Sequence, residues 1–151
     1  MKAYRKRLDT GMEDCGDCAQ PDMLPGVRKP SFVLPYGGGE IWFEHLDNMG
    51  PRTELVLDKL RRDSRSFLLP SRPAQIGFVL SETRVTKAMI DEIAALLCGG
   101  QKAFRRVCFI GTDRKTRRML QDALRNKSRF ALSFINDFEQ AKAWLVSEAV
   151  L

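Results

Sequence analysis

Short apolar runs and longer amphipathic stretches alternate along most of this chain, and this alternation predicts its secondary structure. Runs of roughly four to eight aliphatic, aromatic and β-branched residues are typical of strands. They occur at 31–35, 40–46, 76–80, 106–110 and 130–135. Apolar residues that recur about every three or four positions are typical of helices. Such stretches begin near 51, 86, 113 and 136. The predicted order is therefore β-β-α-β-α-β-α-β-α.

Local signals mark where these elements begin and end. The glycines at 37–39 separate the first two strands as a hairpin loop would. Pro51 stands at the start of the first helix, where its missing N–H does no harm. Thr86 is a good N-cap for the second helix. Asn136, with Glu139 three residues later, has the pattern of a capping box for the last helix.

The order of elements predicts one α/β domain over 31–151. Helices that alternate with strands favour a mostly parallel or mixed sheet, because each helix links one strand to the next. We expect a mixed sheet of four to five strands with about four helices. Residues 1–30 hold charges of both signs, several glycines and prolines and no sustained period. This composition predicts a flexible or loosely packed N-terminal arm.

Composition limits the class of protein only broadly. The 151 residues carry a net charge of +6 with an isoelectric point near 9.4, which favours an anionic partner. No apolar run approaches the roughly 18 residues that a bilayer span needs. The basic start of the chain is followed by no apolar segment, so we expect a cytoplasmic protein without a membrane span.

The chain contains none of the motifs that usually announce catalysis. It has no glycine-rich phosphate loop and no nucleophile elbow. Cys15 and Cys18 have the spacing of half a zinc site, but no second pair follows, so they are weak metal candidates. Cys98 and Cys108 lie in apolar surroundings, as small core residues do. His45 has no evident catalytic partner. We expect neither an enzyme nor a cofactor.

A strand, a polar turn and a strongly basic helix at 107–129 form the most distinctive feature. Ten Lys or Arg residues lie between Lys102 and Arg129, opposed by Asp113 and Asp122. Cations in the first turns of a helix oppose the positive end of its dipole. Three interpretations remain open: a solvated helix face, a surface that docks an acidic protein, and a site for nucleic acid or another phosphate-bearing ligand. The aromatic residues nearby are committed to strands, which weakens the nucleic-acid interpretation.

The chain resembles the STAS domain of anti-sigma factor antagonists and sulfate transporters, and most closely its SpoIIAA-like branch. The resemblance covers about 31–149 and rests on the apolar strands at 76–80 and 107–110. Its most suggestive part is the ending Ser133-Phe134-Ile135-Asn136-Asp137-Phe138-Glu139-Gln140-Ala141-Lys142-Ala143-Trp144-Leu145. The family carries a phosphorylated residue in an Asp-Ser-Ser/Thr-Gly loop. The corresponding stretch at 81–86 lacks the Asp-Ser pair and the Gly, but it offers Ser81, Thr83 and Thr86.

The resemblance implies a non-enzymatic regulatory or adaptor domain that acts by protein–protein docking. We expect the docking surface at the sheet edge that holds the 81–86 loop and the 111–113 turn. Thr112, Arg114, Lys115 and Arg118 are the candidate residues for binding an anion or an acidic protein partner there. The alternative is a binder of an anionic ligand, such as a nucleotide, a lipid headgroup or nucleic acid, on the basic 105–129 surface.

Overall fold

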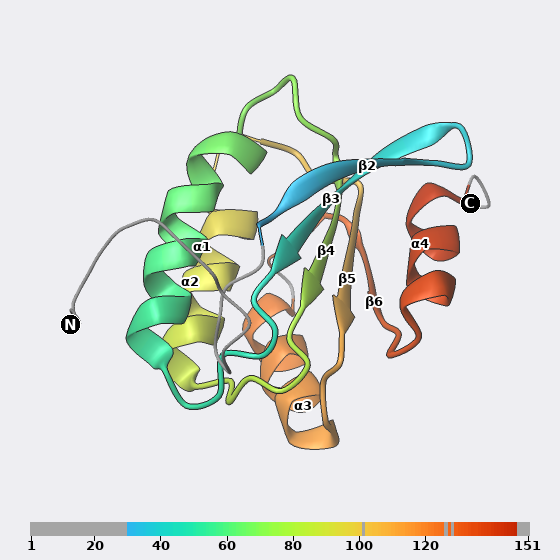
Figure 1. The fold of residues 1–151 in the computed structure, drawn as a ribbon. Helices are drawn as coiled ribbons and strands as arrows, with labels where there is room; N and C mark the ends of the chain where they lie inside the picture. Colours follow the sequence, from blue (N-terminus) through green and yellow to red (C-terminus); the bar gives the residue numbers. More distant parts are fainter. Residues whose placement is uncertain (1–29, 101, 126, 128, 148–151) are drawn as a thin grey trace, which may run out of the picture.

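The structure, a computed structural model, describes residues 30–100, 102–125, 127 and 129–147. Within these residues five strands and four helices follow one another in the predicted order (Figure 1). The strands are β2 (Phe32–Tyr36), β3 (Gly39–His45), β4 (Gln75–Val79), β5 (Arg106–Ile110) and β6 (Ala131–Phe134). The helices are α1 (Thr53–Phe67), α2 (Lys87–Cys98), α3 (Arg114–Leu124) and α4 (Phe138–Val146).

All five strands form one mixed sheet in the order β2-β3-β4-β5-β6. β2 and β3 pair antiparallel as a hairpin, and the remaining neighbours pair parallel. The hairpin turns at Gly37 and Gly38, whose positive φ angles of 56° and 85° suit glycine. The predicted α/β fold, with a mixed sheet of four to five strands and about four helices, is confirmed.

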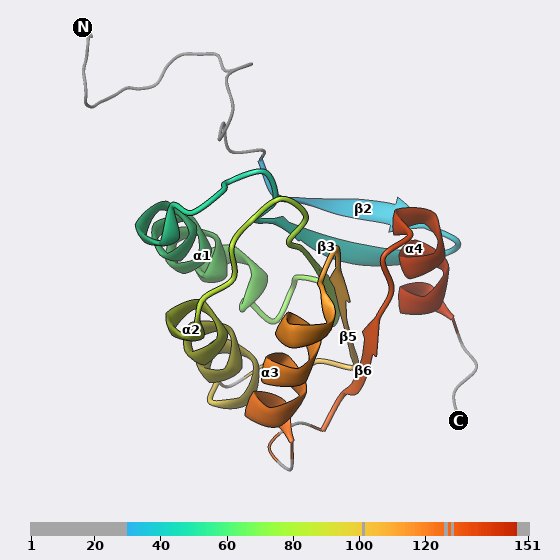
Figure 2. The same ribbon diagram turned by 90° about the horizontal axis from the view of Figure 1, so that it is seen from below.

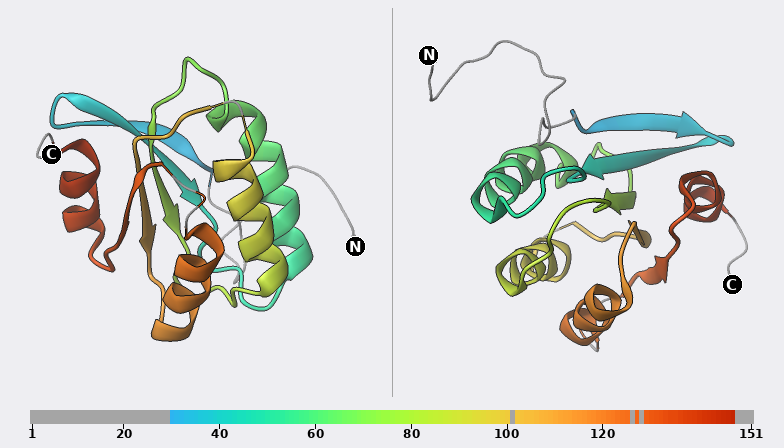
Figure 3. Two further views of the ribbon diagram at one scale, coloured as in Figure 1. Left: turned by 180° about the vertical axis from the view of Figure 1, so that it is seen from behind. Right: turned by 60° about the horizontal axis from the view of Figure 1, so that its bottom comes forward.

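The helices divide unequally between the two faces of the sheet. α1, α2 and α3 lie side by side on one face, whereas α4 alone covers the other (Figures 2 and 3). The larger core cluster lies under the three helices and contains Phe67, Phe78 and Phe109 among its fully buried side chains. The smaller cluster joins α4 to β3, β4 and β5 through residues such as Phe43 and Leu145.

The structure confirms one of the two predicted helix caps and contradicts the other. Thr86 caps α2 as predicted, because its side chain accepts a hydrogen bond from the Met89 amide. The predicted cap of α4 at Asn136 is wrong. Asp137 caps this helix instead and accepts hydrogen bonds from the amides of Glu139 and Gln140. Asn136 turns toward another loop and cannot serve both sites.

Two predictions concern parts of the chain that lie outside the described residues. These are the N-terminal arm at 1–30, of which only Pro30 is described, and the weak metal candidates Cys15 and Cys18. Within the described ranges, none of the helices combines the length and the apolar character that a membrane crossing requires.

Candidate functional site

The carboxyl ends of the four parallel strands bring four loops to one edge of the sheet, which we call the carboxyl edge. These loops are 46–50, 81–86, 111–113 and 135–137, and they follow β3, β4, β5 and β6 at the arrowhead end of the sheet (Figure 1). Ligands and partners of parallel α/β sheets commonly bind at this edge. The two loops singled out in the sequence, 81–86 and 111–113, both belong to it.

Backbone hydrogen bonds tie the first two loops together. Asn48 donates to the Ser81 carbonyl at 2.7 Å, and Gly50 donates to the Glu82 carbonyl at 3.0 Å. The Arg84 amide returns a bond to the Gly50 carbonyl at 2.9 Å. Three bonds across two loops fix their relative position, so the 81–86 loop is a firm part of the edge.

Thr83 completes this connection with its side chain. Its hydroxyl donates to the Leu46 carbonyl and accepts from the Met49 amide. A hydroxyl with both roles occupied is a structural element of the loop. Thr83, one of the three hydroxyl candidates from the sequence, is therefore poorly suited to modification, since phosphorylation would remove the proton that it donates to the Leu46 carbonyl.

Ser81 lies directly over Gly111, where the second and third loops meet. A Cβ atom at Gly111 would approach the Ser81 amide nitrogen to 2.8 Å and the Ser81 Cα to 2.9 Å. Gly111 also has a φ of 82°, which L-residues with side chains rarely adopt. The half-buried Ser81 hydroxyl has no hydrogen-bond partner among the described residues, unlike those of Thr83 and Thr86. Of the three hydroxyl candidates, Ser81 is therefore the one whose hydroxyl makes no hydrogen bond with a described residue.

Asn136 connects the last two loops of the carboxyl edge. Its side-chain carbonyl accepts from the amides of Gly111 at 3.0 Å and Thr112 at 3.2 Å. The carboxylate of Asp113, which caps α3, accepts from the Thr116 amide at 2.8 Å. That hydrogen bond lowers the pKa of Asp113. Asn136 and Asp113 thus occupy three backbone amides at this edge, those of Gly111, Thr112 and Thr116.

Backbone strain also gathers at the carboxyl edge. Asn48 and Glu82 have φ angles of 61° and 58°, and they are the two non-glycine residues in the described part of the chain with positive φ. Such conformations cost about 1–3 kcal/mol each and cluster at functional sites. Their presence in two adjoining loops favours the carboxyl edge as the functional surface.

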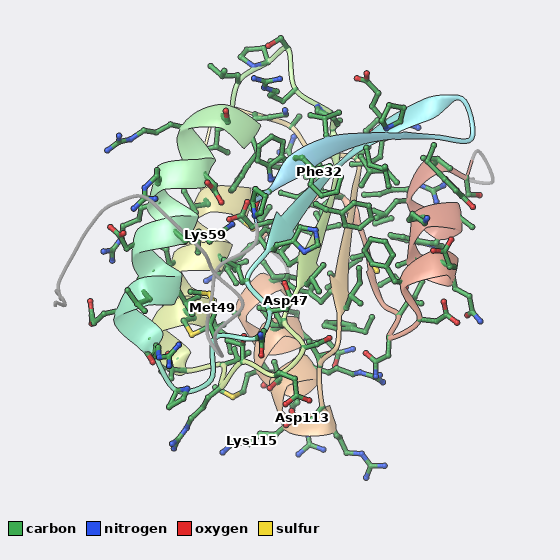
Figure 4. All side chains as sticks on the ribbon, viewed as in Figure 1. Phe32, Asp47, Met49, Lys59, Asp113 and Lys115 are labelled. Carbon is green, nitrogen blue, oxygen red and sulfur yellow. The ribbon has the colours of Figure 1, made fainter. Side chains whose placement is uncertain are left out.

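The predicted binding residues divide by exposure. Thr112 is buried, 5% exposed, and its hydroxyl oxygen has no hydrogen-bond partner in the described structure. Arg114, Lys115 and Arg118 are exposed, and none of them forms an ion pair with a described residue. Figure 4 places Lys115 beside Asp113 at the end of the molecule beyond the strands. These three cations are available to a partner.

The predicted basic surface over 105–129 is not continuous. Arg106 is buried, donates to the Trp144 carbonyl at 2.6 Å and stacks on the Trp144 ring, so it belongs to the packing of α4. Arg125 pairs with Asp122 at 3.1 Å. The remaining exposed cations form two groups. One is at the carboxyl edge, and the other, Arg105, Lys127 and Arg129, is near the opposite ends of the strands.

A buried polar cluster that the sequence did not reveal lies between β3 and α1. Glu44 is fully buried and accepts from Trp42 Nε1 at 2.9 Å. Lys59 on α1 reaches this carboxylate, with its ammonium 3.8 Å from Glu44 and 2.7 Å from Asp63. Lys59 also donates to the Ser31 hydroxyl at 2.6 Å. The cluster thereby anchors the start of β2 to the rest of the domain. The i, i+4 spacing of Lys59 and Asp63 is the one sequence signal by which it could have been found.

The pKa values of the two carboxyl groups in this cluster are shifted in opposite directions. Burial, followed by the hydrogen bond to Asp63, raises the pKa of Glu44 to about 9. Burial alone would raise the pKa of Asp63, but hydrogen bonds from Glu44 and Lys59 outweigh it and lower that pKa. With Glu44 protonated, the cation of Lys59 faces the single carboxylate charge of Asp63.

This protonation predicts a pH dependence that Glu44→Gln removes. The folded-state pKa of Glu44 lies above the ordinary 4.5, so its stabilising contribution is complete below about pH 4.5 and declines as pH rises to about 9. The decline is at most about 1.4 kcal/mol per pH unit. Glutamine mimics the protonated acid and does not titrate. Urea unfolding at several pH values should show the wild type losing stability relative to Glu44→Gln between pH 5 and pH 9; a constant difference would contradict the assignment.

A His–Asp pair was also missed in the sequence. His45 Nδ1 lies 3.3 Å from Asp47 Oδ1 at the end of β3, and the ring stacks on the exposed Phe32 with 5.5 Å between centroids. The sequence signal was the His-x-Asp spacing at the end of a strand. The nearby Ser31 hydroxyl accepts hydrogen bonds from the His45 backbone amide and from Lys59 Nζ, so its known contacts are structural.

In the part of the chain that the structure describes, no group of three His, Cys, Asp or Glu residues is placed to hold a metal ion. Comparisons with protein-family models, with curated proteins and with solved structures find no match to this chain. The function must therefore be argued from the carboxyl edge itself.

Proposed function

We propose that this chain is a STAS-like regulatory or adaptor domain that docks an acidic protein surface at its carboxyl edge. The observation that carries the proposal is the pairing of a firm, cross-bonded set of loops with three exposed cations. Arg114, Lys115 and Arg118 have no ion-pair partner among the described residues. A rigid loop surface favours docking, because little backbone freedom is lost when charges of the partner meet its unpaired cations.

The same geometry weighs against a phosphate cradle at this edge. The amides of Gly111, Thr112 and Thr116 are occupied by Asn136 and Asp113. The Asp113 carboxylate itself would repel an anion at the start of α3. A protein partner can place its carboxylates against the outward-pointing cations without entering the helix start.

Support for the STAS-like assignment comes from the order of elements and from the terminal strand and helix. We assign to Ser81 any regulatory phosphorylation of the 81–86 loop, since its hydroxyl carries no hydrogen bond in the described structure. A phosphate there would bring negative charge to the docking surface and alter its fit to an acidic partner.

Charge reversal at the start of α3 tests the proposal. The double variant Arg114→Glu/Arg118→Glu is expected to lose the partner in a pull-down from the native lysate at low salt. Its free energy of unfolding should stay within about 1 kcal/mol of the wild type or rise, because an acidic residue in the first helical turn complements the dipole. If the variant loses the partner but keeps its stability, Arg114 and Arg118 take part in docking.

The matched control is Arg105→Glu/Arg129→Glu, which changes the net charge by the same amount at the other end of the strands. It should retain the stoichiometric partner that the first variant loses. Equal capture by wild type and both variants would contradict the docking surface. Nucleic acid that is recovered in place of a protein and released by salt would contradict the adaptor function.

A further inference from the structure

β6 is the last strand of the sheet, and no described strand lies beyond it (Figures 2 and 3). On its inner side the amides of Ala131 and Ile135 donate to carbonyls on the β5 side at 3.0 and 3.1 Å. In a parallel ladder, alternate residues of a strand point their peptide groups to opposite sides. The N–H and C=O groups of Leu132 and Phe134 therefore point outward, and such a row of peptide groups is a template for another strand.

The two edges of the sheet differ in how they are protected. Natural edge strands are commonly protected by proline or by charged side chains. β2, at the other edge, contains Pro35, which has no N–H to offer an added strand. The residues of β6 are uncharged and include no proline. The α4 side of β6 is also open, because α4 packs on β3, β4 and β5, and Ala131 on that side is exposed.

The outer side of β6 is complementary to itself when two copies run antiparallel about Ser133. In this register Leu132 of one copy opposes Phe134 of the second copy, and the reverse pair follows by symmetry. Both residues point their peptide groups outward, so each pair can exchange both of its N–H···O=C bonds. Their side chains are half-buried on the three-helix side of the sheet. Contact across the joint would remove the rest of this apolar surface from water.

The charges that flank β6 suit the same register. Arg129 precedes the strand and Asp137 follows it, at equal distances in sequence from Ser133. Arg129 of one copy therefore opposes Asp137 of the second copy at both ends of the joint. Both side chains are exposed, and Arg129 forms no ion pair with a described residue. Ser133, which meets its own copy on the two-fold axis, is small and uncharged, so no like charges are opposed there.

We propose that two copies of this chain associate through β6 as a symmetric dimer, in which the sheet continues from one copy into the second copy. The joint is one short strand wide, so the dimer is weak and depends on concentration. The net charge of +6 on each copy opposes association, and at about 0.15 M salt this repulsion is screened beyond about 8 Å. The pairing uses none of Arg114, Lys115 and Arg118, so it does not depend on the docking function.

Opposite charges at Ser133 test this register on the full chain by sedimentation equilibrium. Ser133→Lys and Ser133→Asp should each raise the dimer dissociation constant about fivefold or more, because each variant opposes like charges on the two-fold axis. An equimolar mixture of the two should associate at least as tightly as the wild type, since lysine of one copy then meets aspartate of the other. The controls are Ala95→Lys and Ala95→Asp on the exposed side of α2. They change the net charge equally and should associate as the wild type does, alone or mixed.

Amide hydrogen exchange of the wild type locates the joint without any substitution. The amides of Leu132 and Phe134 should exchange more slowly as the protein concentration rises, because only the dimer pairs them. A wild type that stays monomeric up to its solubility limit would overturn the proposal. So would a mixture of the two Ser133 variants that associates no better than either variant alone, or protection of these two amides that does not change with concentration. Loss of the protein partner in the pull-down has no bearing on any of these results.

Discussion

Replacing Gly111 with alanine is expected to lower the free energy of unfolding by about 2–5 kcal/mol. Two costs combine at this position. The φ of 82° places an L-residue in the left-handed region, at about 1–2 kcal/mol. The new Cβ would also meet the Ser81 amide nitrogen at 2.8 Å and the Ser81 Cα at 2.9 Å. Because these are backbone atoms, relief requires the loops to separate, and such overpacking costs about 1–3 kcal/mol.

Gly38 provides the matched control for this substitution. Its φ of 85° is nearly the same, but a Cβ there would find no atom within 4 Å. Gly38→Ala should therefore show only the conformational cost of about 1–2 kcal/mol. Urea unfolding of the two variants measures the difference. Equal losses would mean that the 81–86 and 111–113 loops are not pressed together at Gly111.

Replacing Lys59 with methionine is expected to cost about 3 kcal/mol, the second large effect. Methionine keeps the length and the apolar packing but removes the cation that neutralises Asp63. The hydrogen bond that holds Ser31 against α1 is lost with it. Since the Asp63 side chain is 21% exposed, water relieves part of the loss, so we place the effect at the lower end of the range for broken buried pairs.

Lys87→Met is the control, because Lys87 and Asp91 have the same residue types and the same i, i+4 spacing on α2. Their side chains are 79% and 59% exposed, against 7% for Lys59. An exposed pair of this kind contributes about 0.3–0.5 kcal/mol. Thermal and urea unfolding should show that Lys59→Met loses several times more unfolding free energy than Lys87→Met. Similar small losses would contradict the structural role of the cluster under β2.

Much of the fold could be predicted because each element carries its own local signal. The apolar run at 107–110 lies within β5, which is buried along its length. Thr116, Leu120 and Leu124 recur every four residues on α3 and are the residues of this helix that lie buried against the core. Periodicity reports which face of a helix is buried, and that face depends little on the identity of its neighbour.

The candidate site was predicted only in outline. That the loops at 81–86 and 111–113 share an edge follows from parallel pairing, and their positions agree. Which hydroxyl is unbound does not follow from the sequence, since Ser81, Thr83 and Thr86 are alike as residue types. Their roles separate only when Leu46, Met49 and Met89 come into reach.

Asn136 and Asp137 show most clearly which features the sequence determines and which the tertiary structure determines. Both are good caps for a helix that begins at Phe138, and the sequence by itself determined that a cap stands there. The tertiary structure decided which one serves, because β5 and β6 pair in parallel and bring the Gly111 and Thr112 amides to Asn136. The sequence likewise determined that the chain is basic and where its strands and helices lie. Only the folded structure decided that Arg106 is buried against Trp144, that Glu44 is buried beside Lys59, and that Arg114, Lys115 and Arg118 are exposed without an ion pair to a described residue. Local periodicity is set by neighbours a few residues away, whereas exposure and pairing are set by residues that folding brings from tens of positions apart.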